Sequence, residues 1–485
     1  MYTVDVAQAV TTRTKIVATI GPASRTPEAL RRLLLAGVNV FRLNFSHGSH
    51  AEHSDVLSRI RAVSREAGQH VAILQDLCGP KMRLGAIPGD SVECALGEEF
   101  SLVADPDATG ARELTCSYRE LANDLKVGET VLLADGTVAM TVTEIRPGRA
   151  RLKVTQPGRL RSRQGVNLPG SDLAVSSLTD KDLADLDWTA RHAADVDFVG
   201  LSFVRSPEDV ASLRHQLAAR AIPARVVVKI EKPQAVAQLD AIVAAADAVM
   251  VARGDLGVEM DVQRVPAIQK RIIALCNHAH RPVITATQML NSMEHANRPT
   301  RAEASDVFNA VLDGSDAVML SGESAVGEYP FEAVNTMRDL CAQAEAYLKT
   351  SRIARGELPP LAGLIDPLTE AAVDAACLMA GRLDAELIVV AAKTGRTALS
   401  LSNRRPGAAI LALAHSERVA CALSLCWGIT ATLAPDVSTA EQLMAFAIDW
   451  ARARGLVRPG QHAVLLREQV AGHADARAVL AGQVR

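Results

Sequence analysis

The sequence contains few aromatic residues: phenylalanine, tryptophan and tyrosine together make up 3% of its 485 positions. Surfaces that bind single-stranded nucleic acid stack bases on aromatic side chains, so this scarcity argues against such a role. The chain also lacks a basic stripe, because basic and acidic residues are mixed along it and leave a net charge of −3. We therefore expect neither nucleic acid nor an anionic membrane as a partner.

Paired cysteines and long apolar runs are also missing. The eight cysteines are scattered singly, with no CxxC pair and no Cys/His cluster at zinc spacing, which argues against disulfides and a zinc site. Cys421 and Cys426 are expected to pack within a helix. The longest apolar stretch, residues 241 to 252, is interrupted by Asp247, and the first residues lack a signal-peptide core. These patterns favour a cytoplasmic protein.

The residues that are present are typical of a large α/β enzyme. Hydrophobic residues make up 48% of the chain and charged residues 22%, as in globular proteins. Eight short β-branched runs alternate with amphipathic stretches, which predicts parallel strands joined by crossover helices. The predicted strands span residues 15–21, 38–46, 71–79, 197–203, 225–231, 248–257, 282–290 and 315–324. The fold class that follows is a (β/α)8 TIM barrel.

Two further regions interrupt and follow this barrel. After the third strand, residues 85–176 contain Gly/Pro turns and short alternating runs, which predicts a β-rich lid domain inserted at the catalytic rim. A helix over residues 331–349 closes the barrel, and the run RGELPPLAGLIDP is a predicted linker. The predicted domains are a barrel over residues 1–84 and 177–350, the lid, and a C-terminal doubly wound α/β domain over residues 351–485.

Polar residues gather where the predicted strands end, which is where the active sites of such barrels lie. Listed from the second strand onward, these residues are Arg42, Asn44, Ser46, His47, Asp76, Lys81, Arg83, Lys229, Glu231, Arg253, Gly254, Asp255, Thr287, Gln288, Ser321 and Glu323. Glu231 and Asp255 end adjacent strands, and two carboxylates with few other protein ligands suit Mg²⁺ or Mn²⁺ completed by substrate and water. The alternative is an ion pair with Lys229 or Arg253.

Three other features of these strand ends suit an anionic substrate. Lys229 lies on the same strand face as Glu231, so its ammonium could neutralise charge on a transferred group or form a salt bridge without a catalytic role. Arg42 offers a planar fork for phosphate or for a salt bridge at the rim. The glycines beside Asp255 allow backbone N–H groups to turn toward a ligand carboxylate, or simply form a turn.

Hydroxyl and imidazole groups add weaker signals. Thr287 and Ser321 end the last two strands, and their hydroxyls could hold a carboxylate or relay a proton, although each could also be a satisfied core hydroxyl. His47 could act as a base or pack against a nucleotide, while a hydrogen-bonded turn histidine is the plainer interpretation.

A long series of motifs carries a more specific signal. In chain order they include KIVATIGPASR, VFRLNFSHG, DLCGPKMRLG, QGVNLPG, VVVKIEKP, VMVARGDLGVE, ITATQMLNSM and SDAVMLSGESA. Together these motifs strongly resemble pyruvate kinase over residues 13–340, and the rest of the chain resembles it more loosely. The resemblance implies a mobile lid, an allosteric C-terminal domain and a homotetramer. The implied reaction, the last step of glycolysis, passes the phosphoryl group of phosphoenolpyruvate to ADP, giving ATP and pyruvate.

The resemblance also implies a role for each residue of the site. Glu231 and Asp255 would hold Mg²⁺, and Lys229 would stabilise the phosphoryl group during transfer. Arg42 would bind the phosphate, and the backbone of Gly254 and Asp255 would bind the carboxylate with Thr287. Thr287 and Ser321 would lie near the proton that reaches the enolate. The residues that would face the nucleotide are Asn44, His47, Arg83 and Arg163, the last of which adjoins Gln164 where the family usually has lysine.

The family also has a monovalent-cation pocket, which maps here to Asn44, Ser46, Asp76 and the carbonyl of Leu77. Potassium-dependent members have a TKGPE run where this chain reads LCGPK, so Lys81 stands in place of a glutamate. In this respect the chain resembles the potassium-independent bacterial branch. A tethered ammonium can supply the positive charge of a bound K⁺, and we therefore predict activity without potassium.

A second site is predicted in the C-terminal domain. The run KTGRTA follows a predicted strand and opens a helix, so its amides and side chains could hold a phosphate. The resemblance makes this an effector site for a sugar phosphate or a nucleotide, formed by Lys393, Thr394, Gly395, Arg396 and Thr397. Alternatively, Thr394 caps the helix and no ligand is needed. The C-terminal run lacks the family's usual Gly/Thr/Asn loop, and Val326 replaces a common lysine.

Two other classes of protein compete with this interpretation. Barrel lyases that stabilise a pyruvate enolate with Mg²⁺ also place two carboxylates on adjacent strands, but they need neither a lid nor Lys229. A regulatory pseudoenzyme would keep the fold and bind metabolites without turnover, and Gln164 and Val326 are the features that point there. Formation of pyruvate from phosphoenolpyruvate and ADP would separate these classes.

Overall fold

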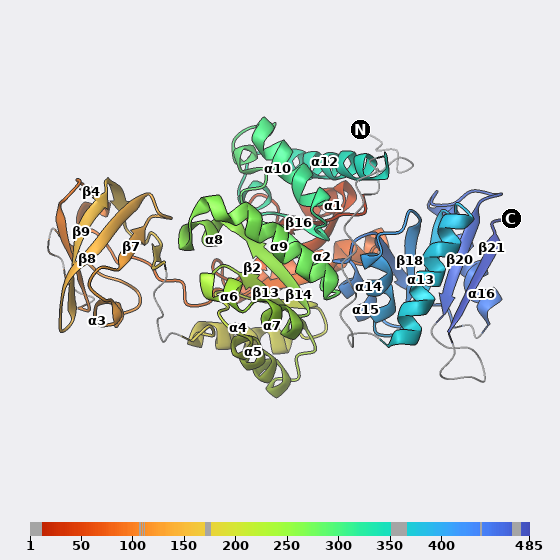
Figure 1. Cartoon of the computed structure of the whole chain (residues 1–485), viewed down its shortest axis with the longest axis horizontal. Coiled ribbons are helices and arrows are strands. Elements are labelled where there is room, and N and C mark those ends of the chain that lie inside the picture. Colours follow the sequence, from red (N-terminus) through yellow and green to blue (C-terminus); the bar gives the residue numbers. More distant parts are fainter. Residues whose placement is uncertain are drawn as a thin grey trace.

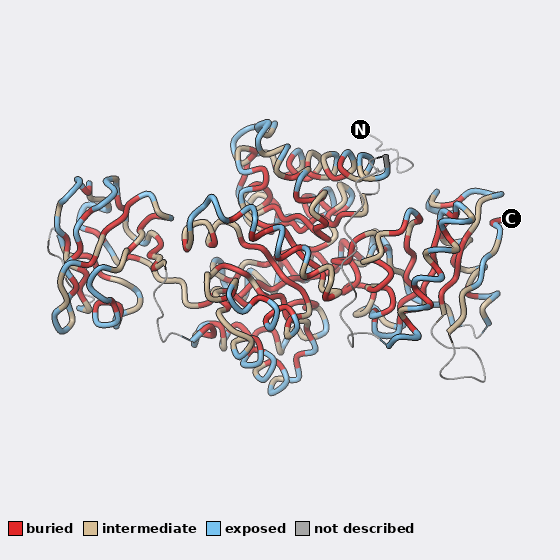
Figure 2. The backbone as a smooth tube through the Cα atoms, viewed as in Figure 1, coloured by how far each residue is buried: buried red, intermediate tan, exposed pale blue. Residues whose placement is uncertain are grey.

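The computed structural model describes residues 12–105, 108, 110, 112–169, 176–350, 366–436, 439–467 and 477–485. Its elements form three parts in a row: a β-rich part, a central barrel and a C-terminal α/β part (Figure 1). Buried residues are concentrated along the barrel strands and the C-terminal sheet (Figure 2). Among the described helices, none combines the length and the apolar character that crossing a membrane requires.

Eight parallel strands close the central barrel, which confirms the predicted fold class. They are β1 (Lys15–Thr19), β2 (Val38–Asn44), β3 (Ala72–Asp76), β12 (Phe198–Leu201), β13 (Arg225–Ile230), β14 (Ala248–Ala252), β15 (Val283–Ala286) and β16 (Ala317–Leu320). Around the barrel the order is β1-β16-β15-β14-β13-β12-β3-β2. Each strand ends before its predicted bound, because the polar residues at its carboxyl end leave the ladder and form the rim.

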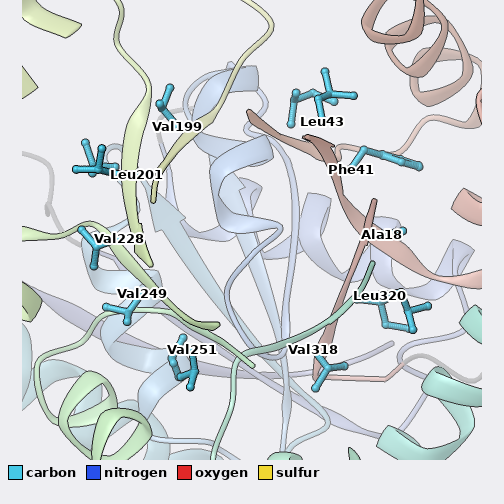
Figure 3. Packing of buried hydrophobic residues seen from close by; sticks show 14 of the residues in the cluster. Ala18, Phe41, Leu43, Val199, Leu201, Val228, Val249, Val251, Val318 and Leu320 are labelled. Carbon is cyan, nitrogen blue, oxygen red and sulfur yellow. The ribbon is translucent and has the colours of Figure 1, made fainter. Parts of the chain in front are cut away.

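Successive strand residues alternate between two apolar layers. Val17 and Val40 pack inside the barrel, whereas Ala18 and Phe41 pack outside it against the helices. Figure 3 shows side chains of this outer layer around the ring of strands. Burial of both faces explains why the strands are nearly continuous apolar runs in the sequence.

Helices surround the barrel (Figure 1). The longer ones are α1 (Pro27–Ala36), α2 (His50–Ala67), α4 (Asp180–Arg191), α5 (Pro207–Ala219), α7 (Leu239–Ala245), α8 (Arg253–Glu259), α9 (Val265–His278), α10 (Arg301–Leu312) and α12 (Pro330–Thr350). Short ones are α6 (Pro233–Ala237), α11 (Gly322–Ala325), η3 (Val262–Arg264) and η4 (Asn291–Glu294). Capping boxes fix several starts, such as Ser49 with Glu52 before α2.

The β-rich part follows β3, as predicted, and has its own apolar core. Its elements are η2 (Pro88–Asp90), β4 (Ser91–Cys94), β5 (Glu99–Val103), β6 (Glu113–Leu114), α3 (Leu121–Asp124), β7 (Thr130–Leu133), β8 (Val138–Arg146), β9 (Arg149–Gln156), β10 (Gly158–Arg161) and β11 (Val166–Asn167). They form a six-stranded sheet, β11-β7-β8-β9-β5-β6, and a two-stranded sheet, β10-β4. We call this part, from Ser91 to Asn167, the lid.

The C-terminal part is a five-stranded sheet of order β19-β18-β17-β20-β21. The parallel strands are β17 (Leu387–Ala392), β18 (Ala409–Ala414), β19 (Ile429–Leu433) and β20 (His462–Arg467), and β21 (Ala478–Gln483) is antiparallel to β20. The helices α13 (Pro367–Arg382), α14 (Arg396–Asn403) and α15 (Glu417–Leu423) pack in one core cluster, and α16 (Ala440–Ala453) packs in another. Strand β21 was not predicted, and most of the predicted linker lies outside the described residues.

The C-terminal part closes the amino-terminal end of the barrel. Ala422 and Leu425 pack in the same apolar cluster as the barrel's interior residues. Cys421 and Cys426, like the other six cysteines, are free. Cys421 lies in α15 as predicted, but Cys426 follows the end of that helix, so the prediction of a helical position is wrong for Cys426.

Candidate active site

A polar cavity of about 110 Å³ opens at the carboxyl ends of the barrel strands. It is lined by Arg42, Asn44, Ser46, His47, Asp76, Cys78, Lys81, Arg83, Ser202, Phe203, Lys229, Glu231 and Asp255. Ten of these residues are predicted site residues, which four strands and the loops after them bring together. Cys78, Ser202 and Phe203 were not predicted. For Ser202 the signal was available, since it is a polar residue at the carboxyl end of a barrel strand.

Lys229 lies at the centre of this cavity wall, on β13. Its Nζ is 2.8 Å from Glu231 Oε1 and 3.6 Å from Asp76 Oδ1, and it donates to Ser202 Oγ at 2.8 Å. Burial acts to lower the pKa of Lys229, but the charges of Asp76 and Glu231 outweigh it and raise that pKa above its usual value. The ammonium is therefore permanently charged and held by three partners.

Glu231 and Asp255 differ in their surroundings. Glu231 is fully buried, and its Oε2 accepts the backbone N–H of Phe203 at 2.7 Å. Burial raises the pKa of Glu231, with the charge of Lys229 acting in the opposite direction. Asp255 lies in the first turn of α8, and its side chain is 28% exposed. Both acids line the cavity, Glu231 as the buried one and Asp255 as the accessible one.

These two acids fit a divalent cation that takes only two ligands from the protein. Of the two acids, Glu231 has a buried oxygen, Oε1, that accepts no hydrogen bond of good geometry, although Lys229 lies 2.8 Å from it. The same is true of Oδ1 of the neighbouring Asp76, 3.6 Å from Lys229. No group of three or more potential metal ligands among His, Cys, Asp and Glu exists in the described parts of the chain. The alternative ion pair exists for Glu231 with Lys229, whereas Arg253 pairs with Asp306 and not with Asp255.

Arg42 reaches the cavity from β2 and is anchored on both sides. Its guanidinium pairs with Asp76 Oδ2 at 2.6 Å and donates to Thr19 Oγ1 at 2.9 Å. Burial acts to raise the pKa of Asp76, but the charges of Lys229 and Arg42 outweigh it and lower that pKa. Asp76 therefore orients both cations, and Arg42 is only 9% exposed.

Three residues of the predicted monovalent-cation pocket, Asn44, Ser46 and Asp76, line the same cavity, whereas Leu77 does not. Asn44 Oδ1 accepts the backbone N–H of Ser46 at 3.1 Å, and the Leu77 carbonyl accepts the Ser202 hydroxyl at 2.8 Å. Lys81 enters from the loop after β3, and its Nζ lies 3.9 Å from Asp255 Oδ1. The ammonium of Lys81 thus lines the same cavity as Asn44 and Ser46.

Thr287 and Gly254 are joined directly. The Thr287 hydroxyl accepts the backbone N–H of Gly254 at 2.7 Å. Thr287 and the next residue, Gln288, have φ values of 67° and 52°, in the left-handed region that β-branched residues rarely adopt. Arg253 holds this turn by donating to the Thr287 carbonyl at 2.7 Å and to the Gln288 carbonyl at 3.2 Å. From Arg253 onward the ARGDLG run lies in a helix, α8, whereas the predicted strand extended to residue 257 with a turn at its glycines.

Ser321 directly follows β16, and Glu323 lies in the short helix α11. The Ser321 backbone N–H donates to Glu323 Oε2 at 2.7 Å, and Oε1 of the same carboxylate accepts the Leu290 N–H at 3.1 Å. Burial raises the pKa of Glu323. Glu323 is therefore a structural residue that ties the end of β16 to the segment after β15, and it leaves the Ser321 hydroxyl at the rim.

Three of the predicted nucleotide residues, Asn44, His47 and Arg83, line the cavity. Burial, with the nearby charges of Arg83 and Lys81, lowers the pKa of His47, which favours the neutral imidazole. Arg83, in the segment that leads into the lid, donates to the carbonyl of Arg163, near the end of the lid, at 3.3 Å. Arg163 itself is exposed, with a φ of 65°, and does not line the cavity in this structure.

The predicted effector residues form the turn between β17 and α14. Gly395, with a φ of 87°, is the N-cap of α14, so the alternative in which Thr394 caps the helix is wrong. Lys393, Thr394 and Arg396 are exposed, and Thr397 is buried. The Thr394 carbonyl accepts Arg225 Nη2 at 3.2 Å, which connects this turn to the start of β13.

Comparisons with known proteins agree with this architecture. The family model "Pyruvate kinase, barrel domain" matches residues 11–334, and "Pyruvate kinase, alpha/beta domain" matches residues 370–480. A pyruvate kinase of Clostridium acetobutylicum is 39% identical over 456 residues, 93% of this chain and 95% of the relative. "Pyruvate kinase 2" of a Synechocystis species is 41% identical over 473 residues, 96% of this chain and 78% of the relative. The crystal structure of a pyruvate kinase from Cryptosporidium parvum superposes with a TM-score of 0.87 at 34% identity, over 98% of this chain and 96% of that one.

Proposed function

The chain belongs to the pyruvate kinase family and is a phosphotransferase, and from this premise we propose a specific chemistry for its site. The proposed reaction transfers the phosphoryl group of phosphoenolpyruvate to ADP with Mg²⁺ or Mn²⁺, gives ATP and pyruvate, and serves as the last step of glycolysis in the cytoplasm. The observation that carries the proposal is the largely buried Lys229, held between Asp76, Glu231 and Ser202 in the wall of a cavity that Arg42 also lines.

Glu231 and Asp255 are the proposed ligands of the divalent ion. When bound there, the ion would supply positive charge to the substrate oxygens. Two protein carboxylates leave most of the coordination sphere to substrate and water, which is how Mg²⁺ is held in sites that act on phosphates. Mn²⁺ accepts the same oxygen ligands.

Arg42 and Lys229 are the proposed phosphoryl-binding residues. The Arg42 guanidinium presents planar donors to the phosphate, while Asp76 and Thr19 fix its orientation. Lys229 keeps its proton because of its acidic neighbours, so its ammonium stabilises the negative charge of the phosphoryl group during transfer. Both groups are preorganised by contacts that exist without substrate.

Thr287 and Ser321 are the proposed residues for the other end of the substrate. The turn that carries Thr287, together with the backbone of Gly254 and Asp255 at the start of α8, binds the carboxylate. The hydroxyls of Thr287 and Ser321 lie near the path of the proton that reaches the enolate carbon. We assign Asn44, His47, Arg83 and Arg163 to the nucleotide, and Arg163 reaches it only when the lid moves toward the barrel.

We propose that the enzyme needs no potassium. Lys81 lines the cavity beside Asn44, Ser46 and Asp76, and its ammonium takes the place of the monovalent cation. The residues of the predicted cation pocket, including the Leu77 carbonyl, then serve as polar neighbours of this charge.

The remaining proposals concern regulation and assembly. The turn from Lys393 to Thr397 would bind the phosphate of a sugar or a nucleotide, which is supported by its exposed cations and by the amides at the start of α14. We also propose that the domains divide after residues 84, 176 and 350. The chain is proposed to assemble as a homotetramer. Light scattering of the purified chain, with and without sugar phosphates, tests the assembly.

A coupled assay tests the proposed reaction. The chain is mixed with phosphoenolpyruvate, ADP and MgCl₂ in sodium buffer without potassium, and pyruvate is measured with lactate dehydrogenase and NADH. Pyruvate that appears only with both ADP and Mg²⁺ supports the proposal. If the chain binds phosphoenolpyruvate but forms no pyruvate, the result would support the pseudoenzyme. Carbon–carbon cleavage without nucleotide would support the lyase class.

A further inference from the structure

A buried carboxylate outside the active-site cavity joins the lid to the barrel. Glu259 is the last residue of α8 and is 2% exposed. Its Oε1 accepts the side-chain amide of Asn167, on lid strand β11, at 3.0 Å. The same oxygen accepts Lys232 Nζ, from the segment after β13, at 2.7 Å. We call Asn167, Glu259 and Lys232 the hinge clamp.

The hinge clamp is attached to the elements that carry the two proposed metal ligands. Lys232 directly follows Glu231, and Glu259 lies four residues after Asp255 in α8. Residues four apart lie on the same helix face, so a small rotation or shift of α8 moves both acids together. A change in the position of Asp255 on substrate binding would therefore also move Glu259 and its contact with the lid.

The lid is connected to the barrel at this point by two paired segments. Arg83 and Gly165 form an isolated antiparallel bridge, and the Val166 N–H donates to the Met82 carbonyl at 3.0 Å. Asn167 is the next residue after this pairing. The side-chain contact with Glu259 therefore lies where the chain leaves the lid.

The surroundings of the hinge clamp leave room for movement. A cavity of about 50 Å³ beside it is lined by the three clamp residues, by Pro80, Met82, Val166, Leu168 and Phe203, and by the polar residues Lys81, Arg205 and Gln234. The second oxygen of Glu259, Oε2, is buried and accepts no hydrogen bond within the described residues. A buried carboxylate oxygen without a donor is unfavourable, so a further donor brought in by lid movement would stabilise a second position.

We propose that Glu259 is a positioning residue that couples occupancy of the metal and substrate site to the position of the lid. This proposal rests on the proposed function, since lid closure over phosphoenolpyruvate and ADP is what it regulates. Glu259 does not touch the reacting atoms; it acts through Asn167 on the lid side and through α8 on the site side.

The test uses the full chain and the variants Glu259→Gln, Asn167→Ala and their combination. Lid position is followed by energy transfer between labels at Arg146 in the lid and Arg271 on α9, both exposed, with and without Mg²⁺, phosphoenolpyruvate and ADP. Turnover is measured in parallel. Each single variant is expected to lower kcat about tenfold and to reduce the ligand-dependent change in energy transfer, and the combination is expected to be no worse than either one. Lys153→Ala, an exposed lid position, is the matched control.

The proposal would be overturned by single variants with wild-type kcat and wild-type lid closure, or by effects that add in the combined variant. If Glu259→Gln does not fold, the proposal is tested with Asn167→Ala alone. Asn167 is only partly buried, and its replacement removes the same contact with Glu259. A purely structural role would lower thermal stability and leave the ligand-dependent change in energy transfer intact. The proposed function is judged separately, by wild-type turnover in the same assay.

Discussion

At the scale of single residues, Lys229 shows how the site holds a positive charge with little exposure to solvent. Its side chain is 12% exposed, and its ammonium is stable here because Asp76 and Glu231 lie within 3.6 Å and 2.8 Å of it. Replacement by methionine removes the cation and leaves Glu231 without an ion-pair partner and Asp76 with Arg42 alone, which costs about 3–5 kcal/mol of folding stability. We expect Lys229→Met to lower kcat by about a thousandfold and to lower the melting temperature.

Two further variants separate the catalytic effect from the structural one. In the double variant Lys229→Met/Glu231→Gln the buried, unpaired charge of Glu231 is removed. This variant is therefore expected to regain part of the lost folding stability without regaining activity. Lys153→Met, in the lid, is exposed and is expected to leave both quantities unchanged. Turnover by Lys229→Met within tenfold of wild type would show that the ammonium is not required.

Lys81 provides the test of cation dependence. Wild type is expected to be fully active in sodium or Tris buffer, because the Lys81 ammonium supplies the positive charge near Asp255. Lys81→Glu reverses that charge, and its kcat without potassium is expected to fall about tenfold or more and to recover when KCl is added. The measurement is the coupled assay in KCl and NaCl at equal ionic strength.

The reverse pattern would contradict the role of Lys81. Wild-type activity that vanishes without potassium would exclude it, and so would a Lys81→Glu variant that responds equally to KCl and NaCl. Lys153→Glu makes the same charge change at an exposed lid position and is expected to show no response to potassium.

The position of polar residues at strand ends explains which site residues the sequence could predict. Parallel strands in a closed barrel all end at one rim, so polar residues after distant strands can be assigned to one cavity from the sequence. Ser202 obeys the same rule but was overlooked, and the role of Asp76 as a partner of both Arg42 and Lys229 depends on side-chain directions across neighbouring strands. The hinge clamp could not be predicted, because the Asn167 contact depends on where the lid lies.

At the scale of elements, the end of β15 is held in an unfavourable backbone conformation by one side chain. Arg253 donates to carbonyls of Thr287 and Gln288, and its Nη1 pairs with Asp306 at 2.7 Å. Residues such as Thr287 cost about 1–3 kcal/mol in the left-handed region. Arg253→Met removes this support, so we expect relaxation of the turn and a kcat/KM for phosphoenolpyruvate about a hundredfold lower.

The matched variant for this prediction is Asp306→Asn. It removes the ion pair but keeps the donors of Arg253 on the two carbonyls, so its kcat/KM is expected to stay within about fivefold of wild type. Thermal unfolding of both variants is measured to show that the folded state persists. An Arg253→Met enzyme with normal kcat/KM would mean that the turn is held by other contacts.

The elements themselves were predictable to different degrees. The barrel strands are apolar on both faces, which gave an unambiguous signal, and the helices begin at recognisable capping residues such as Ser49. Helix α8 was not predicted, because it contains two glycines and follows directly on β14, and the predicted strand was extended over it to residue 257. Strand β21 was missed because its pairing with β20 is antiparallel and at the sheet edge, where pattern alone is weak.

At the scale of the whole molecule, the C-terminal part is attached to the barrel through buried charges. Arg405 is 7% exposed at its side chain and pairs with Asp316, at the start of β16, at 3.0 Å. The Trp427 N–H donates to the same carboxylate at 3.3 Å. Lys15, the first residue of β1, donates to the Ile429 carbonyl at 2.6 Å. No sequence pattern predicted these contacts, because they depend on how two separately folded parts dock.

Lys15 makes this docking sensitive to pH. Burial lowers the pKa of Lys15 to about 8, against the opposing charges of Cys426, Glu345 and Asp316. Below pH 8 both folded and unfolded chains keep the proton. Between pH 8 and the usual lysine range near 10.5 only the unfolded chain keeps it, so the contribution of Lys15 to stability rises with pH. The free energy of unfolding of wild type, minus that of Lys15→Met, is therefore expected to increase by about 2 kcal/mol from pH 7 to pH 10 in denaturant titrations. A difference that is flat or falls over this range would mean that Lys15 stays charged at the interface between barrel and C-terminal part.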